Sequence, residues 1–203
     1  MTIVPSIIAK DQKELNARYK KIKGISKTIH LDIMDGAFVK NKSLWFDFKL
    51  PKGDYEAHLM TTRPEMFIGR HVSSINTFMV HIETTKKPQD VIDFVRQENK
   101  KIFFALNPET PIGKVKKYLT KIDGVLVMTV KPGKYGAKFI PKSLNKVKQL
   151  RKLNRFIPIE VDGSINNKTI TLARKAGANR FSVGSYIQKS KTPKKALDEL
   201  KNL

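Results

Sequence analysis

The chain has 203 residues and a formal net charge of +22 at pH 7, because 40 Lys and Arg outnumber 18 Asp and Glu. This length fits one domain over residues 1–203 with a sizeable core. Cysteine is absent, which excludes disulfides and thiolate metal ligands.

The chain begins with the apolar run Thr2–Ala9, which Pro5 interrupts. The run is too short for a signal peptide or a membrane span, so we expect a cytoplasmic protein. From there, β-branched apolar runs alternate with amphipathic stretches. The predicted strands are Ile3–Ile8, Thr28–Met34, Tyr55–Met60, Thr77–Ile82, Lys101–Leu106, Gly124–Val130, Ile157–Val161 and Arg180–Val183. The predicted helices are Asp11–Ile22, Pro64–Ser73, Pro88–Glu98, Pro111–Ile122, Pro141–Leu153, Asn167–Ala176 and Thr192–Asn202.

This alternation predicts the fold class. Strands that are regularly separated by helices imply a parallel sheet, and eight such units imply an α/β protein with a single closed (β/α)8 TIM barrel. Only the second unit is irregular. Between Asn41 and Tyr55 the chain has Pro51, Gly53 and an aromatic cluster at 45–48, with no room for a full helix. We therefore expect a truncated second helix.

Four potential metal ligands lie in or directly after predicted strands. His30 and Asp32 are two residues apart in a strand, so their side chains point to the same face. His58 lies within another predicted strand and Asp162 directly follows a third, and barrel strands deliver active-site groups towards their C-terminal ends. Each residue alone is more often an ordinary core group. Together, two imidazoles and two carboxylates suit a divalent transition metal.

The lysines are dispersed over the polar faces of predicted helices. Clustered Lys and Arg can neutralise nucleic-acid phosphates, but here no aromatic residues lie between the lysines to stack bases. We therefore predict solvated helix faces and no specific nucleic-acid binding. The positive field would still attract an anionic phosphorylated substrate.

A series of motifs resembles one family over nearly the whole chain. The motifs are PSIIAKD (5–11), HLDIMDGAFVKN (30–41), HLMTTRPE (58–65), LNPETP (106–111), VLVMTVKPG (125–133), EVDGSIN (160–166) and VGSYI (183–187). Their order and residues resemble ribulose-phosphate 3-epimerase and its relatives, which epimerise phosphorylated ketoses. As a set, H-x-D-x-M-D-G and V-M-T-V-x-P-G are highly specific.

The resemblance implies roles for individual residues. His30, Asp32, His58 and Asp162 sit where the family has its ligands for one divalent ion, with Zn, Fe, Mn or Co chemically acceptable. Asp32 and Asp162 also sit where it has two proton-transfer carboxylates. The residues that match substrate contacts are Ser6, Met34, Met60, Met128, Gly133, Gly136, Gly163, Ser164, Gly184 and Ser185. Ordinary core packing is the alternative role for the methionines.

Inversion at C3 of a ketose explains the need for two carboxylates. One must remove a proton beside the carbonyl, and the other must return a proton from the opposite face. The sequence does not decide which face belongs to Asp32 and which to Asp162. A divalent ion would stabilise the developing negative charge, and backbone N–H groups of glycine-containing loops would hold the phosphate.

The chain departs from the family pattern at three places. The common G-F-G-G-Q loop reads Gly133-Lys134-Tyr135-Gly136-Ala137, Ser164 replaces a second glycine, and Ala37-Phe38-Val39-Lys40-Asn41 replaces His-Phe-Val-Pro-Asn. These changes bear on substrate choice and on subunit contacts, but not on the catalytic residues.

The predicted reaction interconverts D-ribulose 5-phosphate and D-xylulose 5-phosphate. A D-allulose 6-phosphate/D-fructose 6-phosphate 3-epimerase is the alternative, because HLMTTRPE, LNPETP and VDGSIN resemble that branch at least as much. A non-catalytic phosphate- or nucleic-acid-binding barrel is disfavoured, because all four metal-site residues are retained. The expected partners are a phosphorylated ketose and further copies of the chain in a homo-oligomer, with no membrane.

Overall fold

The computed structural model describes residues 1–133 and 136–203; Lys134 and Tyr135 of the altered loop lie outside the described residues. The parallel strands are β1 (Thr2–Ile7), β2 (Thr28–Asp35), β4 (Asp54–Met60), β5 (Thr77–His81), β6 (Lys101–Leu106), β7 (Gly124–Met128), β8 (Ile159–Asp162) and β9 (Arg180–Val183). Their order is β1-β9-β8-β7-β6-β5-β4-β2, and β1 also pairs with β2, so the sheet closes. The predicted (β/α)8 barrel is therefore confirmed.

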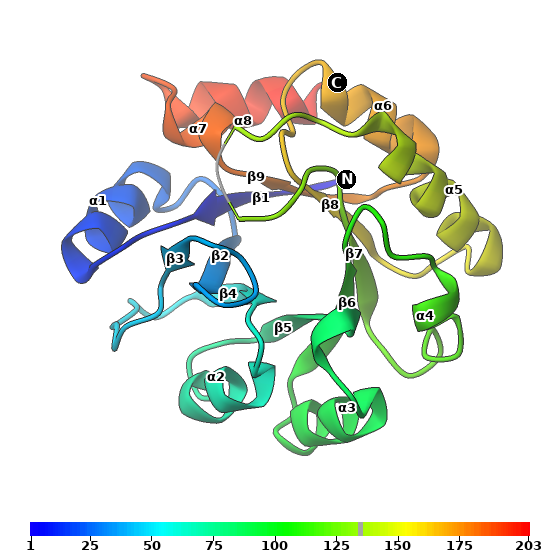
Figure 1. Ribbon diagram of the computed structural model, residues 1–203. Helices are drawn as coiled ribbons and strands as arrows, with labels where there is room; N and C mark the ends of the chain where they lie inside the picture. The colour runs from blue at the N-terminus through cyan, green and yellow to red at the C-terminus, as the bar shows by residue number, and fades with distance from the viewer. Residues whose placement is uncertain (134–135) are drawn as a thin grey trace.

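Helices surround this barrel (Figure 1). They are α1 (Gln12–Ile22), α2 (Pro64–His71), α3 (Pro88–Gln97), α4 (Gly113–Lys116), α5 (Leu144–Leu153), α6 (Thr169–Ala176), α7 (Ser185–Gln188) and α8 (Pro193–Lys201), with 3-10 turns η1 (Ile82–Thr84) and η2 (Pro141–Ser143). The Asp11 carboxylate caps α1 by accepting a 2.8 Å hydrogen bond from the Glu14 N–H. Proline begins α2, α3 and α8, where no backbone N–H is needed.

Two units differ from the expectation. Among residues 36–53 the only regular element is β3 (Lys42–Ser43), which is antiparallel to β2. The second helix is thus absent rather than truncated, and Leu44 and Phe48 pack against the barrel in its place. The predicted helix Pro111–Ile122 is reduced to α4, which starts at Gly113 without a side-chain cap. Glycine and the missing cap both weaken a helix start.

The two faces of the barrel sheet have different contents. Outward-facing side chains pack under the helices in the main core; Phe78, Phe104 and Phe181 are fully buried there. Each stabilises the fold by about 1.5–3 kcal/mol relative to an exposed side chain. Inward-facing side chains from and just after β5–β7 form a separate apolar cluster of Met79, Phe103, Ala105, Leu126, Met128 and Val130. The remaining interior holds buried ionisable groups, which are His30, Asp32, Glu56, His58, His81 and Glu160.

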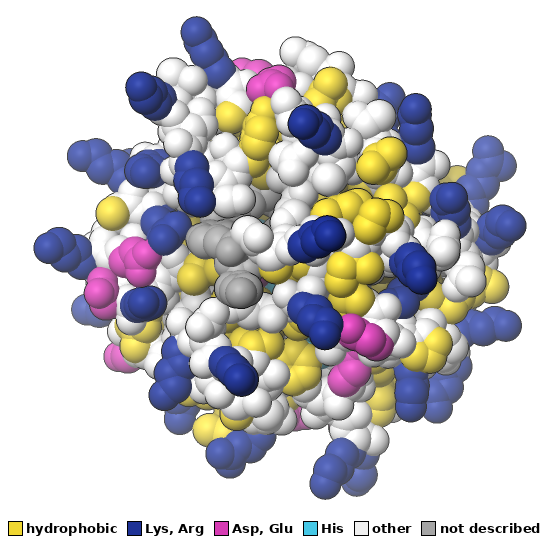
Figure 2. All heavy atoms as spheres, turned by 45° about the horizontal axis from the view of Figure 1, so that its top comes forward, with side chains coloured by type: hydrophobic (Ala, Val, Ile, Leu, Met, Phe, Trp, Pro, Cys, Tyr) yellow, Lys and Arg dark blue, Asp and Glu magenta, His cyan; other side chains and the backbone are white. Residues whose placement is uncertain are grey.

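The surface is strongly basic. Figure 2 shows Lys and Arg side chains spread over the visible face, with fewer acidic groups between them. This distribution fits the predicted solvated helix faces. Over the described residues, no helix combines the length and the apolar character that a membrane span requires.

Candidate active site

The four predicted metal ligands meet inside the barrel, towards the C-terminal ends of the strands. His58 Nδ1 lies 3.4 Å from Asp32 Oδ1 and 3.3 Å from Asp162 Oδ2. His30 Nε2 lies 3.4 Å from the same Asp32 oxygen. One ligand atom from each of the four residues lies within 4.8 Å of the others. Ligands about 2.1 Å from a tetrahedral ion lie roughly 3.4 Å apart, so this spacing fits one cation.

The histidine atoms that face this cluster also fit a metal. Among the described residues, His30 Nε2 and His58 Nδ1 are buried and make no hydrogen bond. Buried polar atoms normally have a partner, so two such nitrogens beside two carboxylates form a group that could hold a cation. Imidazole nitrogen and carboxylate oxygen are suitable ligands for Zn, Mn, Fe or Co. The residues therefore fit the divalent ion that the sequence predicted.

Without a cation, the carboxylates control the protonation of both imidazoles. Burial alone would lower the pKa of His30, but neighbouring carboxylates, Asp32 foremost, hold that pKa well above its usual value. Asp162 and Asp32 likewise raise the pKa of His58 against the effect of burial. Burial would raise the pKa of Asp32, but His30 and His58 outweigh it and lower that pKa. A divalent ion must displace protons from the imidazoles, so its affinity falls in acid.

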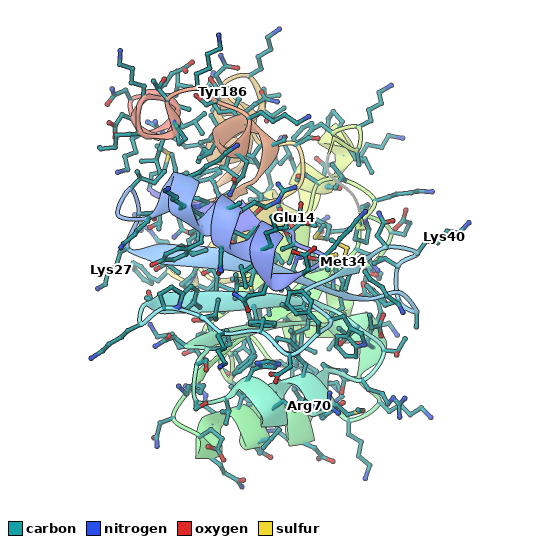
Figure 3. The ribbon with its side chains drawn as sticks, turned by 90° about the vertical axis from the view of Figure 1, so that its left-hand side faces the viewer. Glu14, Lys27, Met34, Lys40, Arg70 and Tyr186 are labelled. Atoms are coloured by element: carbon teal, nitrogen blue, oxygen red, sulfur yellow. The ribbon has the colours of Figure 1, made fainter. Side chains whose placement is uncertain are left out.

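One cavity at the C-terminal mouth of the barrel gathers the other predicted site residues. It is lined by both carboxylates, Asp32 and Asp162, and by Ser6, Met34, Met60, Met128, Gly133, Gly136, Gly163, Ser164, Gly184 and Ser185. Figure 3 shows Met34 towards the end of the barrel from which Lys40 projects into solvent, with Lys27 at the opposite end. The structure thus brings together all the residues that the motifs selected. Their individual roles stay predictions.

The turn after β8 explains why serine can replace the second glycine. Gly163 has a φ of 115°, and a Cβ there would lie 2.4 Å from Val130 Cγ2, so glycine is required. Ser164 has a φ of 53°, a left-handed conformation that glycine adopts more easily. The Ser164 hydroxyl donates to the Ala137 carbonyl oxygen, a contact that glycine could not make. It joins the β8 turn to the loop after β7.

Sequence reasoning missed a charged group beneath His30. We call Glu56, Glu160 and Arg180 the carboxylate–arginine cluster. His30 Nδ1 lies 2.9 Å from Glu56 Oε1 and 3.3 Å from Glu160 Oε1. Arg180 donates to both carboxylates, with its Nε 2.7 Å from Glu160 Oε2. Glu56 and Glu160 precede His58 and Asp162 by two residues, so the same-face spacing could have revealed them.

The cluster holds its two carboxylates in different states. Burial, followed by the Glu160 charge, raises the pKa of Glu56 to about 7. Burial would also raise the pKa of Glu160, but His30 and Arg180 outweigh it and lower that pKa to about 2. Two carboxylates that share one guanidinium therefore hold a proton more readily than isolated ones.

A second missed group lies beside His58, at the C-terminal end of β5. His58 Nε2 is 2.9 Å from His81 Nε2, and His81 Nδ1 is 3.2 Å from Glu83 Oε2. Burial lowers the pKa of His81 to about 4, so its ring is neutral near pH 7. Glu83 also accepts hydrogen bonds from the Asn107 N–H and the Thr110 hydroxyl. The H-x-E spacing at 81–83 was the available sequence signal.

Comparisons with known proteins identify the family of the chain. The Ribulose-phosphate 3 epimerase family matches residues 2–188. The ribulose-phosphate 3-epimerases of Schizosaccharomyces pombe and Bacillus subtilis are each 32% identical over 98% of this chain, and over 92% and 97% of their own lengths. That of Methanocaldococcus jannaschii is 35% identical over 90% of this chain and 82% of its own length.

Solved structures show the same fold at lower identity. A 3-hexulose-6-phosphate synthase has a TM-score of 0.72 at 15% identity, covering 100% of this chain and 99% of its own. The tryptophan synthase α-subunit of Pyrococcus furiosus has a TM-score of 0.73 at 16% identity, covering 100% of this chain and 98% of its own. Fold and family together define a TIM-barrel enzyme, and its candidate active site lies at the C-terminal mouth of the barrel. The chain belongs to the ribulose-phosphate 3-epimerase family and is an isomerase.

Proposed function

We propose that the chain interconverts D-ribulose 5-phosphate and D-xylulose 5-phosphate with one bound divalent ion. The observation that carries this proposal is the meeting of two carboxylates, Asp32 and Asp162, with two unpartnered imidazole nitrogens in one place. The family and the activity named for its curated relatives support a pentulose phosphate as substrate.

Asp32 and Asp162 would transfer the proton at C3 from opposite faces of the sugar. They stand on β2 and β8, with β1 and β9 between those strands, so they reach the cavity from different sides. In each direction one carboxylate, ionised, accepts the C3 proton. Its partner, protonated, then gives a proton to the other face of C3. The same pair serves both directions with the roles exchanged.

The other residues of the cavity would bind and orient the sugar. Met34, Met60 and Met128 offer polarizable sulfur and little competition for hydrogen bonds. Backbone N–H groups at the turns of Gly163 and Gly184 would hold the phosphate. A divalent ion held by the two histidines and two aspartates would supply Lewis-acid stabilisation of the negative charge that develops on the substrate.

The test is a coupled assay on ribulose 5-phosphate and allulose 6-phosphate, with metal content measured on the same sample. We expect turnover of the pentulose, about one divalent ion per chain, loss of turnover on chelation and recovery on re-metallation. Preference for allulose 6-phosphate would establish the hexulose branch instead. Full activity in a rigorously metal-free sample would contradict the metal requirement.

Exchange in heavy water tests the two carboxylates. An Asp162→Asn protein that still binds metal should wash the C3 proton out of one epimer only, and Asp32→Asn should show the reverse preference. Equal residual exchange with both epimers in both variants would mean that one group, or water, performs both transfers.

A further inference from the structure

Ser182 is a buried polar residue of the cavity with no role in the mechanism above. Its hydroxyl oxygen makes no hydrogen bond to any described residue, although the side chain is only 1% exposed. Ser182 lines the same cavity as Asp32 and Asp162. Burying a hydroxyl without a partner costs free energy, so its retention here indicates a partner that arrives with the ligand.

The position of Ser182 on β9 narrows the identity of that partner. Phe181 and Val183 belong to the core under the helices, so Ser182, between them, faces the barrel interior. The pairing of β8 with β9 sets Ser182 opposite Asp162. Gly184, at the proposed phosphate turn, follows two residues later. Ser182 therefore lies between the carboxylate that acts at C3 and the phosphate-binding end of the cavity.

We propose that Ser182 hydrogen-bonds the sugar hydroxyl that lies between C3 and the phosphate. In a pentulose 5-phosphate this is the C4 hydroxyl. A serine hydroxyl both donates and accepts, as a sugar hydroxyl does, so the pair needs no fixed charge. The role rests on the proposed function. It makes Ser182 a residue of substrate specificity, away from the reacting carbon.

Ser143 offers a matched control. Its hydroxyl is also buried without a partner among the described residues, but it lies in η2 and is not among the residues that line the cavity. The variants S182A and S143A each remove one unsatisfied hydroxyl. Both should melt at the wild-type temperature or up to roughly 2–4 °C higher. Only S182A should lose kcat/KM on ribulose 5-phosphate, by about tenfold, with most of the change in KM.

A substrate analogue without the C4 hydroxyl completes the test. Removing the hydroxyl from the sugar and removing it from Ser182 delete the same contact, so the two losses should not add. S182A with the analogue should therefore be no worse than the wild-type enzyme with the analogue. Ribulose 5-phosphate and S143A provide the reference rates for each arm.

Several outcomes would overturn the role of Ser182. Equal kcat/KM for S182A and S143A would do so, as would fully additive losses with the analogue. A lower melting temperature for S182A than for S143A would also do so, because it would show a partner within the folded chain. In each of these cases the wild-type enzyme remains an active epimerase. A wild-type chain inactive on both ribulose 5-phosphate and allulose 6-phosphate would instead overturn the proposed function, and this role with it.

Discussion

The two histidines of the candidate metal site are each held by a neighbouring group, but in different ways. His30 contacts the carboxylate–arginine cluster, in which half-buried Arg180 pairs with the buried carboxyl groups of Glu56 and Glu160. His58 rests on a neutral imidazole, His81, which in turn contacts Glu83. Both histidines would present one unprotonated ring nitrogen to a bound cation. Charged groups support the ring of His30, and a neutral hydrogen-bond partner supports the ring of His58.

The partners of each histidine would fix which of its ring nitrogens faces a bound cation. If His30 Nε2 is the ligand atom, its Nδ1–H donates to Glu56 at 2.9 Å. If His58 Nδ1 is the ligand atom, its Nε2–H must donate to His81 Nε2, and the His81 Nδ1–H must donate to Glu83. Partners of this kind orient metal ligands and commonly change metal affinity by about 10–100-fold. The two supports should therefore fail differently when they are broken.

The largest effect is expected beneath His30. Arg180→Met removes the guanidinium that pairs with ionised Glu160 and with partly ionised Glu56, so the free energy of unfolding should fall by about 3–5 kcal/mol. Urea denaturation of the metal-free protein measures this loss. Arg96→Met is the matched control, because Arg96 pairs with Asp123 at 3.3 Å at the surface with its side chain 47% exposed. That pair contributes about 0–1 kcal/mol.

A double variant sharpens the same prediction. Glu56→Gln in the Arg180→Met background removes the repulsion between the two carboxylates, so it should recover part of the lost stability. If Arg180→Met cost no more than Arg96→Met, the carboxylates would already be neutral in the wild-type protein, and the charged support of His30 would have to be abandoned.

A smaller effect, on metal affinity, is expected when His81, the partner of His58, is replaced. His81→Phe keeps a ring of similar size but cannot accept the His58 proton, so divalent-metal affinity should fall by about 10–100-fold. His81→Gln can accept from His58 and donate to Glu83, so it should retain most of the affinity. Competition with a chelator measures affinity, and the melting temperature of the metal-free protein reports any separate effect on folding.

His71→Phe is the control for this pair of variants. His71 stacks between Phe48 and Phe67 on the outside of the barrel, with ring centroids 4.7 and 4.3 Å away. The His71→Phe variant should leave metal affinity unchanged. Equal metal affinities for His81→Phe and His81→Gln would show that His81 only fills space beside His58.

The two supports also mark the limit of what the sequence could predict. The barrel followed from regularly alternating runs, and the candidate ligand set followed from polar residues in or directly after those runs. Glu56 and His81 also have a spacing signal, but within an apolar strand that signal alone does not tell a core side chain from the support of a ligand. Ser182 was missed for a related reason: a lone serine in a strand carries no signal until the cavity around it is known.

The absent second helix could be anticipated only in part. Pro51 and Gly53 exclude a full helix, but nothing local shows that the segment would form β3 and pack aromatic side chains on the barrel. Tertiary contacts determine the conformation of such a segment. Residue spacing within one element is therefore more predictable from sequence than the path of an irregular connection.

The pH dependence of stability should separate the two supports by sign. The pKa of Glu56 is raised from 4.5 to about 7, so the folded state takes up a proton, and this group stabilises the fold increasingly as the pH falls from 7 to 4.5. The pKa of His81 is lowered from 6.5 to about 4, so the unfolded state binds the proton first. The stability contributed by neutral His81 is therefore lost as the pH falls from 6.5 towards 4.

The smallest predicted effect follows from these opposite signs. Between about pH 7 and pH 5, the destabilisation caused by Glu56→Gln should grow on acidification, because only the wild-type protein gains from protonation. The destabilisation caused by His81→Gln should shrink, because only the wild-type protein loses the stability that neutral His81 contributes. Each change should be on the order of 1–2 kcal/mol in urea unfolding of the metal-free protein. Parallel curves for the two variants would mean that both histidines share one electrostatic environment, and the contrast between a charged and a neutral support would be wrong.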